Sequence, residues 1–422
     1  MVPNLLKPSQ LGGIPKDWKR VRLSDVMKVR QGLQIAISER LKAPTSTSKE
    51  YITIQSIKKT DQDREYVESP SQRVICTKDD VLMTRTGNTG IVVTDVEGAF
   101  HNNFFLMDFD KDKIDKTFLV NYLRSPRVQH LILTKAGAST IPDLNHKDFY
   151  SVEFPLAPVL EQQKIAKILS TWDKAISTTE RLIENSTQQK KALMQQLLTG
   201  KKRLLDDEGK KFEGEWEKRK LSNLGSTFNG ITGKTKVDFG SGKKYIPYMN
   251  IFKNTFIDTD NLDYVNIDDD EKQNTVKFGD IFFTTSSETP EEVGMSSVLL
   301  NKTEEPIYLN SFCFGFRPFE IDKIAPAFIG YILRSSHVRR KIAILAQGAT
   351  RYNLSKVQLL KISIALPSLE EQQKIATVLT NTDKEIELLE QQLADLQQEK
   401  KALMQVLLTG KKRVVVDGEV TT

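Results

Sequence analysis

The stretch that decides the fold is Lys190–Arg203, KKALMQQLLTGKKR, which returns at Lys400–Arg413 as KKALMQVLLTGKKR. The two copies lie 210 residues apart and differ at a single position. The same offset aligns the EQQKIA of Glu161–Ala166 with that of Glu371–Ala376, whereas the residues further upstream share only scattered anchors. This period is far longer than the roughly 20–50 residues of a solenoid repeat. The chain therefore reads as a tandem duplication in which one scaffold carries two diverged modules.

Mostly apolar positions, which begin upstream of each copy and continue into it, alternate at spacings of four and three residues, as is typical of a coiled-coil seam. The seam is polar in its middle, at Thr179, Ser186, Lys190, Thr382 and Lys400. Gly200 and Gly410 follow at once and favour a left-handed helix C-cap. Ser368 and Glu371 have the spacing of a capping box. The seam positions are Ile165, Leu169, Trp172, Ile176, Thr179, Ile183, Ser186, Lys190, Leu193 and Leu197, then Ile375, Leu379, Thr382, Ile386, Leu389, Leu393, Leu396, Lys400, Leu403 and Leu407.

These patterns predict two helices of about 40 residues, each roughly 60 Å long. We expect them to pack as an antiparallel coiled coil, with the modules at opposite ends and a pseudo-twofold axis relating the halves. An amphipathic helix packed on its own module remains the alternative. The predicted segments are module 1 at 1–157, helix and linker at 158–210, module 2 at 211–366, and helix and tail at 367–422.

Each module is predicted to be α+β, with strands early and helices late. The expected strands are Tyr51–Ile57, Arg73–Cys76, Asp80–Arg85, Ile91–Thr94 and Phe104–Phe109 in the first module, and Tyr245–Ile251, Asp280–Thr284, Ser297–Leu300 and Phe312–Phe316 in the second. The expected helices are Lys116–Leu123 running on through Arg127–Lys135, and Pro326–Leu333 running on through Val338–Leu345.

Composition excludes several classes of protein. The net charge of +6 and pI of 8.9 permit nucleic-acid binding without establishing it. No run of apolar residues is long enough for a membrane span, and the start does not resemble a signal peptide. Cys76 and Cys313 fit no zinc or disulfide spacing and are expected to be reduced thiols in a cytoplasmic protein.

No catalytic constellation emerges from the sequence. The four histidines have no metal-ligand spacing. Gly230–Thr235 has two residues between its glycines, whereas a phosphate-binding loop needs four. We therefore expect a binding protein without catalytic or metal-ligating residues, and without a bound cofactor.

The order of module, helix, module, helix resembles that of the specificity subunits of type I restriction–modification systems. The residues that carry the resemblance are Pro155–Ile165, Leu366–Ile375, the LLTGKKR that ends each helix, and the DVLMTRTG of Asp80–Gly87. The resemblance covers essentially the whole chain.

The resemblance implies that each module is a target recognition domain that reads one half of a split double-stranded DNA sequence. It further implies that the helices space the modules and dock two methyltransferase subunits, which modify adenine N6 with S-adenosylmethionine. Motor–nuclease subunits that use ATP and Mg²⁺ complete the complex. Because the modules differ, the target is expected to be asymmetric. A stand-alone DNA-binding protein, or an inactive decoy without modification partners, is the alternative.

Polar loops at strand ends are the natural places for contacts with base edges, and lysines nearby for contacts with phosphates. Arginine pairs well with guanine and asparagine with adenine. Lys356 is a further expected phosphate contact. The residues predicted to contact DNA are Gln55, Arg85, Thr86, Asn88, Thr89, Ser139, Thr140 and Lys147 in the first module, and Lys234, Asn250, Thr285, Ser286, Ser287, Arg351, Tyr352 and Asn353 in the second.

Overall fold

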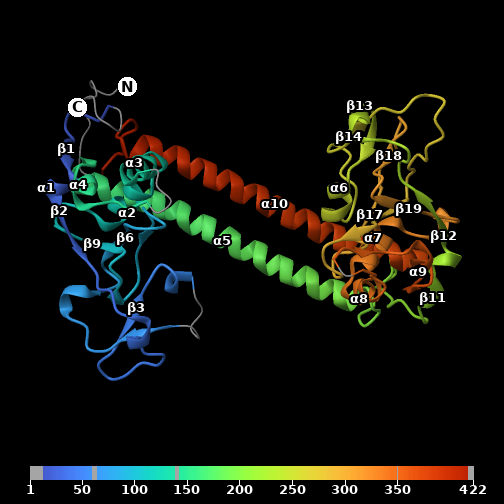
Figure 1. The fold of residues 1–422 in the computed structure, drawn as a ribbon, viewed down its shortest axis with the longest axis horizontal. Coiled ribbons are helices and arrows are strands. Elements are labelled where there is room, and N and C mark those ends of the chain that lie inside the picture. Colours follow the sequence, from blue (N-terminus) through green and yellow to red (C-terminus); the bar gives the residue numbers. More distant parts are fainter. Residues whose placement is uncertain (1–12, 59–63, 138–141, 349, 417–422) are drawn as a thin grey trace. The chain divides into compact units, whose positions relative to one another are not determined.

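The computed structural model describes residues 13–58, 64–137, 142–348 and 350–416, which form two compact units. Unit 1 consists of Met1–Glu180 together with Gln391–Thr422, and unit 2 consists of Arg181–Glu390. Each unit thus contains one module, part of the helix that follows this module, and part of the other long helix (Figure 1). The division into four segments made from the sequence stays a prediction.

Unit 1 is built on two four-stranded sheets (Figure 1). The first has the antiparallel order β2-β9-β6-β7, with strands Met27–Gln31, Phe104–Phe109, Val81–Thr84 and Val92–Val93. The second has the order β4-β3-β8-β5, with strands Tyr66–Val67, Lys49–Ile52, Gly98–Phe100 and Ile75–Cys76. A separate pair joins β1, Lys19–Arg22, to β10, Glu153–Leu156.

The first sheet decides where the polar loops of unit 1 lie. Strand β6 pairs with β9 from Val81, opposite Met107, to Thr84, opposite Phe104. All four residues of β6 are buried, as expected for a central strand. The loop that starts at Arg85 therefore leaves the sheet at the end of its most buried strand.

The described part of unit 1 also contains four short α-helices. They are α1 Leu23–Val26, α2 Lys116–Arg124, α3 Pro126–Ala136 and α4 His146–Tyr150. The predicted continuous helix is interrupted because Ser125 is extended and Pro126, which has no N–H, begins α3. The side chain of Asp115 caps α2 and that of Asn145 caps α4.

Unit 2 repeats this plan. Its main sheet has the order β12-β19-β15-β17, with strands Gly225–Asn229, Cys313–Pro318, Ile281–Thr284 and Ser296–Val298. The second sheet, β14-β13-β18, has strands Asp263–Val265, Phe239–Ile246 and Tyr308–Leu309. The two-stranded pairs are β11, Glu217–Lys220, with β21, Ser363–Leu366, and β16, Ser286–Ser287, with β20, Tyr352–Asn353. The helices are α6 Tyr248–Lys253, α7 Pro326–Arg334, α8 Ser336–Ile344 and α9 Lys356–Leu359.

The predicted strand Arg73–Cys76 is a strand only at Ile75–Cys76, because a 3-10 turn occupies Gln72–Val74. Two further strand predictions continued into a helical turn. The predicted strand Tyr245–Ile251 ends at Ile246, because Pro247 caps a helix in which Asn250 lies. The predicted strand Tyr51–Ile57 ends at Ile52, and a 3-10 turn follows at Ser56–Lys58. In both cases a helical turn follows the strand, and the apolar pattern alone does not show where the strand gives way to it.

The two long helices are α5, Val159–Leu197, and α10, Leu369–Leu407. Every predicted seam position is buried or half-buried, and fully exposed side chains dominate the faces between them. The prediction of a 3.5-residue seam is therefore confirmed, including its polar members Thr179 and Ser186, which are both buried.

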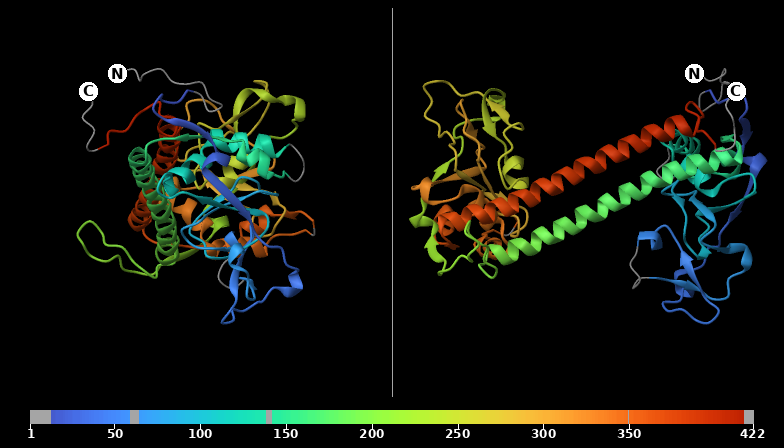
Figure 2. Two further views of the ribbon diagram at one scale, coloured as in Figure 1. Left: turned by 90° about the vertical axis from the view of Figure 1, so that its left-hand side faces the viewer. Right: turned by 180° about the vertical axis from the view of Figure 1, so that it is seen from behind.

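Within each unit the two helices run antiparallel. In unit 1, Lys400 near the end of α10 pairs with Asp173 in the first half of α5. In unit 2, Lys190 near the end of α5 pairs with Asp383 in the first half of α10. Figure 2 shows the ribbons of the two long helices. The two ion pairs join equivalent positions, because each partner is shifted by 210 residues, so the duplicated scaffold makes the same contact twice.

The end of each long helix is locked onto the module beside it. Gly200 and Gly410 have φ values of +70° and +67°, as the predicted C-caps require. Beyond Gly410, Arg413 binds Glu161 at 2.7 and 2.8 Å, and Trp18 donates to the same carboxylate at 2.9 Å. These contacts join the segment that follows α10 to the first turn of α5.

The equivalent lock in unit 2 is made by Arg203, which binds Glu371 at 2.7 Å through two nitrogens. Ser368 accepts a hydrogen bond from the backbone N–H of Glu371 at 3.3 Å, so this half of the predicted capping box is present. The carboxylate of Glu371 accepts hydrogen bonds from Arg203 instead of from the backbone N–H of Ser368, because this carboxylate is fully buried and needs a cationic partner.

Candidate nucleic-acid interface

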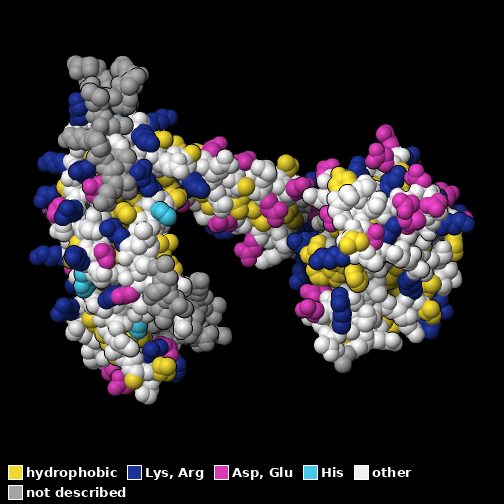
Figure 3. All heavy atoms as spheres, turned by 45° about the horizontal axis from the view of Figure 1, so that its top comes forward, with side chains coloured by type: hydrophobic (Ala, Val, Ile, Leu, Met, Phe, Trp, Pro, Cys, Tyr) yellow, Lys and Arg dark blue, Asp and Glu magenta, His cyan; other side chains and the backbone are white. Residues whose placement is uncertain are grey.

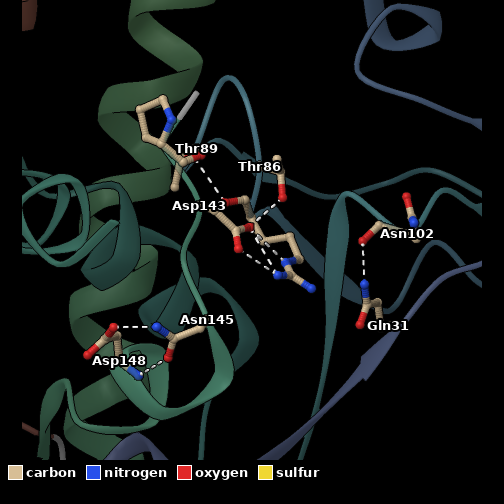
Figure 4. A network of polar contacts seen from close by, with 9 residues as sticks. Gln31, Thr86, Thr89, Asn102, Asp143, Asn145 and Asp148 are labelled. Atoms are coloured by element: carbon tan, nitrogen blue, oxygen red, sulfur yellow. Dashed lines mark hydrogen bonds and ion pairs between the residues drawn. The ribbon is translucent and has the colours of Figure 1, made fainter. Parts of the chain in front are cut away.

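Two loops form a polar clasp at the end of the main sheet in unit 1. One is the loop Arg85–Gly90 after β6, and the other is the segment 142–145, which precedes α4. The backbone N–H of Leu144 donates to Arg85 O at 2.8 Å, and that of Gly87 donates to Pro142 O at 3.1 Å. Thr89 adds a side-chain bond to Pro142 O at 2.8 Å (Figure 4). The structure thus joins the predicted loop Arg85–Gly90 to Pro142 and Leu144, which were not among the predicted contacts.

An ion pair lies at the centre of this clasp. Arg85 Nη2 donates to Asp143 Oδ2 and Oδ1 at 2.9 and 3.0 Å, and Nε donates to Oδ1 at 3.3 Å. Thr86 donates to Asp143 Oδ1 at 2.6 Å (Figure 4). The hydrogen bond from Thr86, together with the contact with Arg85, lowers the pKa of Asp143 below its ordinary value. The carboxylate is therefore ionised at neutral pH and fixed by two neighbours.

A cavity of about 410 Å³ opens beside the clasp. It is lined by Arg40, Thr53, Ile54, Gln55, Thr86, Gly87, Asn88, His101 and Asn103. Three of the predicted contact residues, Gln55, Thr86 and Asn88, therefore share one concave surface. The cavity offers hydrogen-bond donors and acceptors of the kind that base edges require.

Within this cavity His101 is half-buried and has a defined tautomer. Its Nδ1 accepts the backbone N–H of Asn103 at 3.0 Å, which leaves the proton on Nε2. Burial, reinforced by the nearby charge of Arg40, lowers the pKa of His101. The imidazole is therefore neutral at physiological pH.

Unit 2 has its own clasp at the equivalent place. Strand β16 pairs with β20, so that Ser286 lies opposite Asn353 and Ser287 opposite Tyr352. Arg351 Nε donates to Ser286 Oγ at 3.1 Å. The predicted residues Ser286, Ser287, Arg351, Tyr352 and Asn353 therefore lie together, with Thr285 at the start of the same loop.

The backbone of the two clasps is the same although the side chains differ. Leu144 N–H donates to Arg85 O in unit 1, and Leu354 N–H donates to Thr285 O at 2.9 Å in unit 2. The backbones of Thr86 and Asp143 form an antiparallel β-bridge, and Ser286 and Asn353 form the equivalent antiparallel pair in unit 2. By position, the pair formed by Arg85 and Asp143 thus corresponds to Thr285 and Asn353.

Each unit also places a cation over an equivalent phenylalanine. In unit 1 the guanidinium carbon of Arg85 lies 5.4 Å from the ring centre of Phe105. In unit 2 the ammonium of Lys356 lies 5.5 Å from the ring centre of Phe314. The register of β9 and β19 makes the two rings equivalent, since they lie opposite Met83 and Phe283. The positive charge is thus retained at the site, although different elements supply it.

Other predicted residues do not join the clasps. Ser139 and Thr140 lie outside the described residues. Lys147 is exposed on α4, next to the clasp of unit 1. Lys234 pairs with Glu271, and its side chain is only 10% exposed, so its charge is already neutralised.

Asn250 is buried, and its amide is used inside the protein. The side chain donates to Asp258 O and Asn261 O at 2.8 and 2.9 Å, and it accepts from Asp258 N at 3.0 Å. These bonds hold the loop after α6 in place. We therefore leave Asn250 out of the proposed interface.

On the face that Figure 3 shows, basic residues lie on both units. Figure 3 shows Lys and Arg side chains scattered over the visible face of both units and mixed with acidic ones. Some basic residues are structural, as in Arg339, which donates to the carbonyls of Gly294, Val293 and Glu291 at 2.6–2.7 Å. The net charge alone therefore does not locate an interface.

Sequence reasoning missed several residues of the clasps. Asp143, Phe105 and His146, whose ring stacks on Phe105 at 4.8 Å, come from three separate elements. Arg40 and His101 join the cavity from two further segments. The one signal available was the position of Asp143 210 residues before Asn353, in a loop already suspected.

Within the described residues, no cluster of three or more histidine, cysteine or acidic side chains could hold a metal ion. None of the helices in this part of the chain combines the length and apolar character needed to cross a bilayer.

Two α+β units, each with a polar clasp at the end of its main sheet and joined by two long helices, define a modular recognition protein. The chain belongs to the family of type I restriction modification DNA specificity domains, whose family model matches residues 15–186 and again 213–398. It is therefore a DNA-recognition specificity protein, a class that selects the target and does not itself catalyse a reaction.

Relatives match over nearly the full length. The MjaVIII type I restriction enzyme specificity subunit of Methanocaldococcus jannaschii is 27% identical over 430 residues, 95% of this chain and 94% of the relative. The putative MjaX specificity subunit of the same organism is 28% identical over 436 residues, 97% and 96% of the two chains.

Solved structures share the fold. The S subunit from M. genitalium aligns with a TM-score of 0.54 at 16% identity, over 96% of this chain and 99% of the other. A chain from a study of complex assembly and conformational transition in the type I system aligns with a TM-score of 0.56 at 16% identity, over 94% and 99%. The predicted fold class is thereby confirmed.

Proposed function

We propose that each unit reads one half of a bipartite DNA target through its clasp, and that the two half-sites differ. The observation that carries this proposal is the pair of equivalent clasps. Their backbones match, whereas their side chains present a charged Arg85–Asp143 pair in unit 1 and the neutral Thr285 and Asn353 in unit 2. Because base edges are distinguished by their donors and acceptors, different side chains select different bases.

The proposed interface comprises polar residues of both clasps and one lysine near each. In unit 1 it contains Gln55, Arg85, Thr86, Asn88 and Thr89, with Lys147 as a phosphate contact. In unit 2 it contains Thr285, Ser286, Ser287, Arg351, Tyr352 and Asn353, with Lys356 as a phosphate contact. Thr89 acts by holding its loop, since its hydroxyl is already bonded to Pro142 O.

The long helices set the distance between the half-sites and dock two methyltransferase subunits. Support for two equivalent docking sites comes from the near-identity of Lys190–Arg203 and Lys400–Arg413. A coiled-coil seam requires similarity only at its buried positions, but these segments match on every face. Recent duplication would produce the same identity, so the proposal needs a direct test.

Chemistry in the proposed complex belongs to the partners. The methyltransferase subunits would use S-adenosylmethionine to modify adenine N6, and motor–nuclease subunits would use ATP and Mg²⁺ to cleave unmodified DNA. This chain would contribute recognition and spacing.

Co-expression with a type I methyltransferase subunit from the same genome tests this assembly. We expect one copy of this chain to purify with two methyltransferase subunits, as measured by native mass spectrometry. A chain that binds duplex DNA specifically but never retains a methyltransferase would instead favour the stand-alone binding protein or decoy.

A further inference from the structure

The ion pair between Arg85 and Asp143 is not needed to close the clasp. Unit 2 closes the same clasp through the backbone bond from Leu354 to the carbonyl of Thr285, at 2.9 Å against 2.8 Å in unit 1. It does so with an uncharged Asn353 in place of Asp143. Since unit 2 forms its clasp without a charged pair, closing the clasp does not explain why unit 1 has the pair of Arg85 and Asp143.

The geometry of the pair leaves one edge of the arginine available. A guanidinium has two edges that each present two parallel N–H groups. Asp143 occupies the edge formed by Nε and Nη2. Among the described residues, none accepts a hydrogen bond from Nη1 of Arg85. The opposite edge, formed by Nη1 and the outer N–H of Nη2, therefore remains unused.

The free edge is also held in place. Phe105 lies under the guanidinium at 5.4 Å, and the carboxylate is fixed from its other side by Thr86. The Arg85 side chain is 18% exposed and Asp143 is 46% exposed, so the pair lies at the surface of the clasp. A long side chain held in this way loses little further rotamer freedom when it binds.

We propose that Asp143 is a specificity-determining positioning residue, which orients Arg85 so that its free edge binds O6 and N7 of a guanine in the half-site of unit 1. This inference rests on the proposed function. Bidentate pairing of arginine with guanine is the commonest specific contact in the major groove. At the corresponding place in unit 2, Thr285 and Asn353 offer no arginine, so the second half-site lacks this contact.

The test uses the full chain assembled with its methyltransferase subunits and S-adenosylmethionine. The first step determines the motif that is methylated by the complex containing the unaltered chain. Duplexes are then made in which each base pair of this motif is changed in turn. The measurement is kcat/KM for adenine methylation of every duplex. Asp143→Asn is the decisive variant, because asparagine is the residue that the clasp of unit 2 already accommodates.

We expect Asp143→Asn to reduce the preference for guanine at one base pair by about 5- to 150-fold. Arg85→Ala should relax the same base pair, and Asp143→Glu should restore part of the preference. The matched control Asn353→Ala should leave that base pair unaffected and alter only the other half-site.

An Asp143→Asn complex that keeps every base preference would overturn the inference. So would a uniform loss of rate on all duplexes, or a relaxed base pair that contains no guanine, because these indicate a structural role. If the unaltered complex assembles but methylates no motif, the proposed function itself fails, and the inference fails with it. The variants are thus informative only against an active parent, which separates the two failures.

Discussion

Two cysteines show how burial controls chemistry at the scale of single residues. Cys76 and Cys313 lie in separate cores, and both are buried. Burial raises the pKa of Cys76 to about 11 and raises that of Cys313 as well. The thiolate is the reactive form. We predict that neither thiol reacts with an aromatic disulfide reagent at pH 8 in the folded protein, and that both react after denaturation. Rapid labelling of either thiol in the folded protein would contradict this.

His101 predicts a pH dependence of stability. Its pKa is lowered in the folded state by burial, and then by Arg40, so the unfolded chain binds the proton more readily. The contribution to stability is therefore complete above the unfolded pKa of about 6.5 and declines as the pH falls through the folded pKa. The free energy of unfolding of unit 1, measured by denaturant titration between pH 8 and 5, should fall. His101→Asn should flatten this part of the profile, and an unchanged slope in that variant would refute the assignment.

At the scale of elements, the helix ends depend on buried ion pairs. Glu371 is fully buried and Glu161 is 4% exposed. Removing a cationic partner leaves an uncompensated buried charge. We predict that Arg203→Ala destabilises unit 2 by about 3–5 kcal/mol. Arg413→Ala should destabilise unit 1 by less, because Arg413 is more exposed and Trp18 still bonds Glu161. Thermal unfolding followed by circular dichroism measures both, and the exposed Lys202→Ala provides a control. Equal stability of Arg203→Ala and the unaltered protein would contradict the stabilising role of the ion pair between Arg203 and Glu371.

The long helices predict a measurable spacing. Four residues inserted after Glu180 in α5, with four inserted after Glu390 in α10, lengthen each helix by about 6 Å while keeping the pairs within each unit. Against roughly 3.4 Å per base pair, the spacer between half-sites should grow by one or two base pairs. A methylation map of the variant shows this directly, and an unchanged spacer would contradict the spacing role of the helices.

Sequence periodicity predicted both long helices and their approximate length, because a 3.5-residue seam repeated from Ile165 to Leu197 and from Ile375 to Leu407 leaves few alternatives. It also gave most strands of the main sheets. It did not give the end of β13 at Ile246, where Pro247 starts a helix instead. It did not give the partner of Arg85 either, since Asp143 is 58 residues away and only tertiary structure brings the two together.

In the candidate site, residues next to a predicted strand could be named from the sequence, whereas residues brought in from distant segments could not. Loops at strand ends, such as the one from Arg85, could be named because a buried strand precedes them. Cavity residues such as Arg40 and His101 could not, because they come from separate segments without a shared pattern. Asn250 was named because it lies near the end of the predicted strand Tyr245–Ile251, and the structure shows its amide bonded inside the protein.

At the scale of the whole molecule, the duplication explains both the likeness and the difference of the two units. Equivalent ion pairs, C-caps and backbone clasps recur at a spacing of 210 residues or close to it. The side chains of the clasps have diverged, so the two proposed interfaces offer different hydrogen-bonding groups. A scaffold that repeats its contacts while its recognition loops vary would be suited to an asymmetric target.

The most direct test of this account is a genome-wide map of N6-methyladenine in cells that express this chain with its methyltransferase subunits, compared with cells that lack only this chain. The account predicts a new split motif with two different half-sites, modified once on each strand. No new motif despite an assembled complex, or a motif with two identical half-sites, would contradict it.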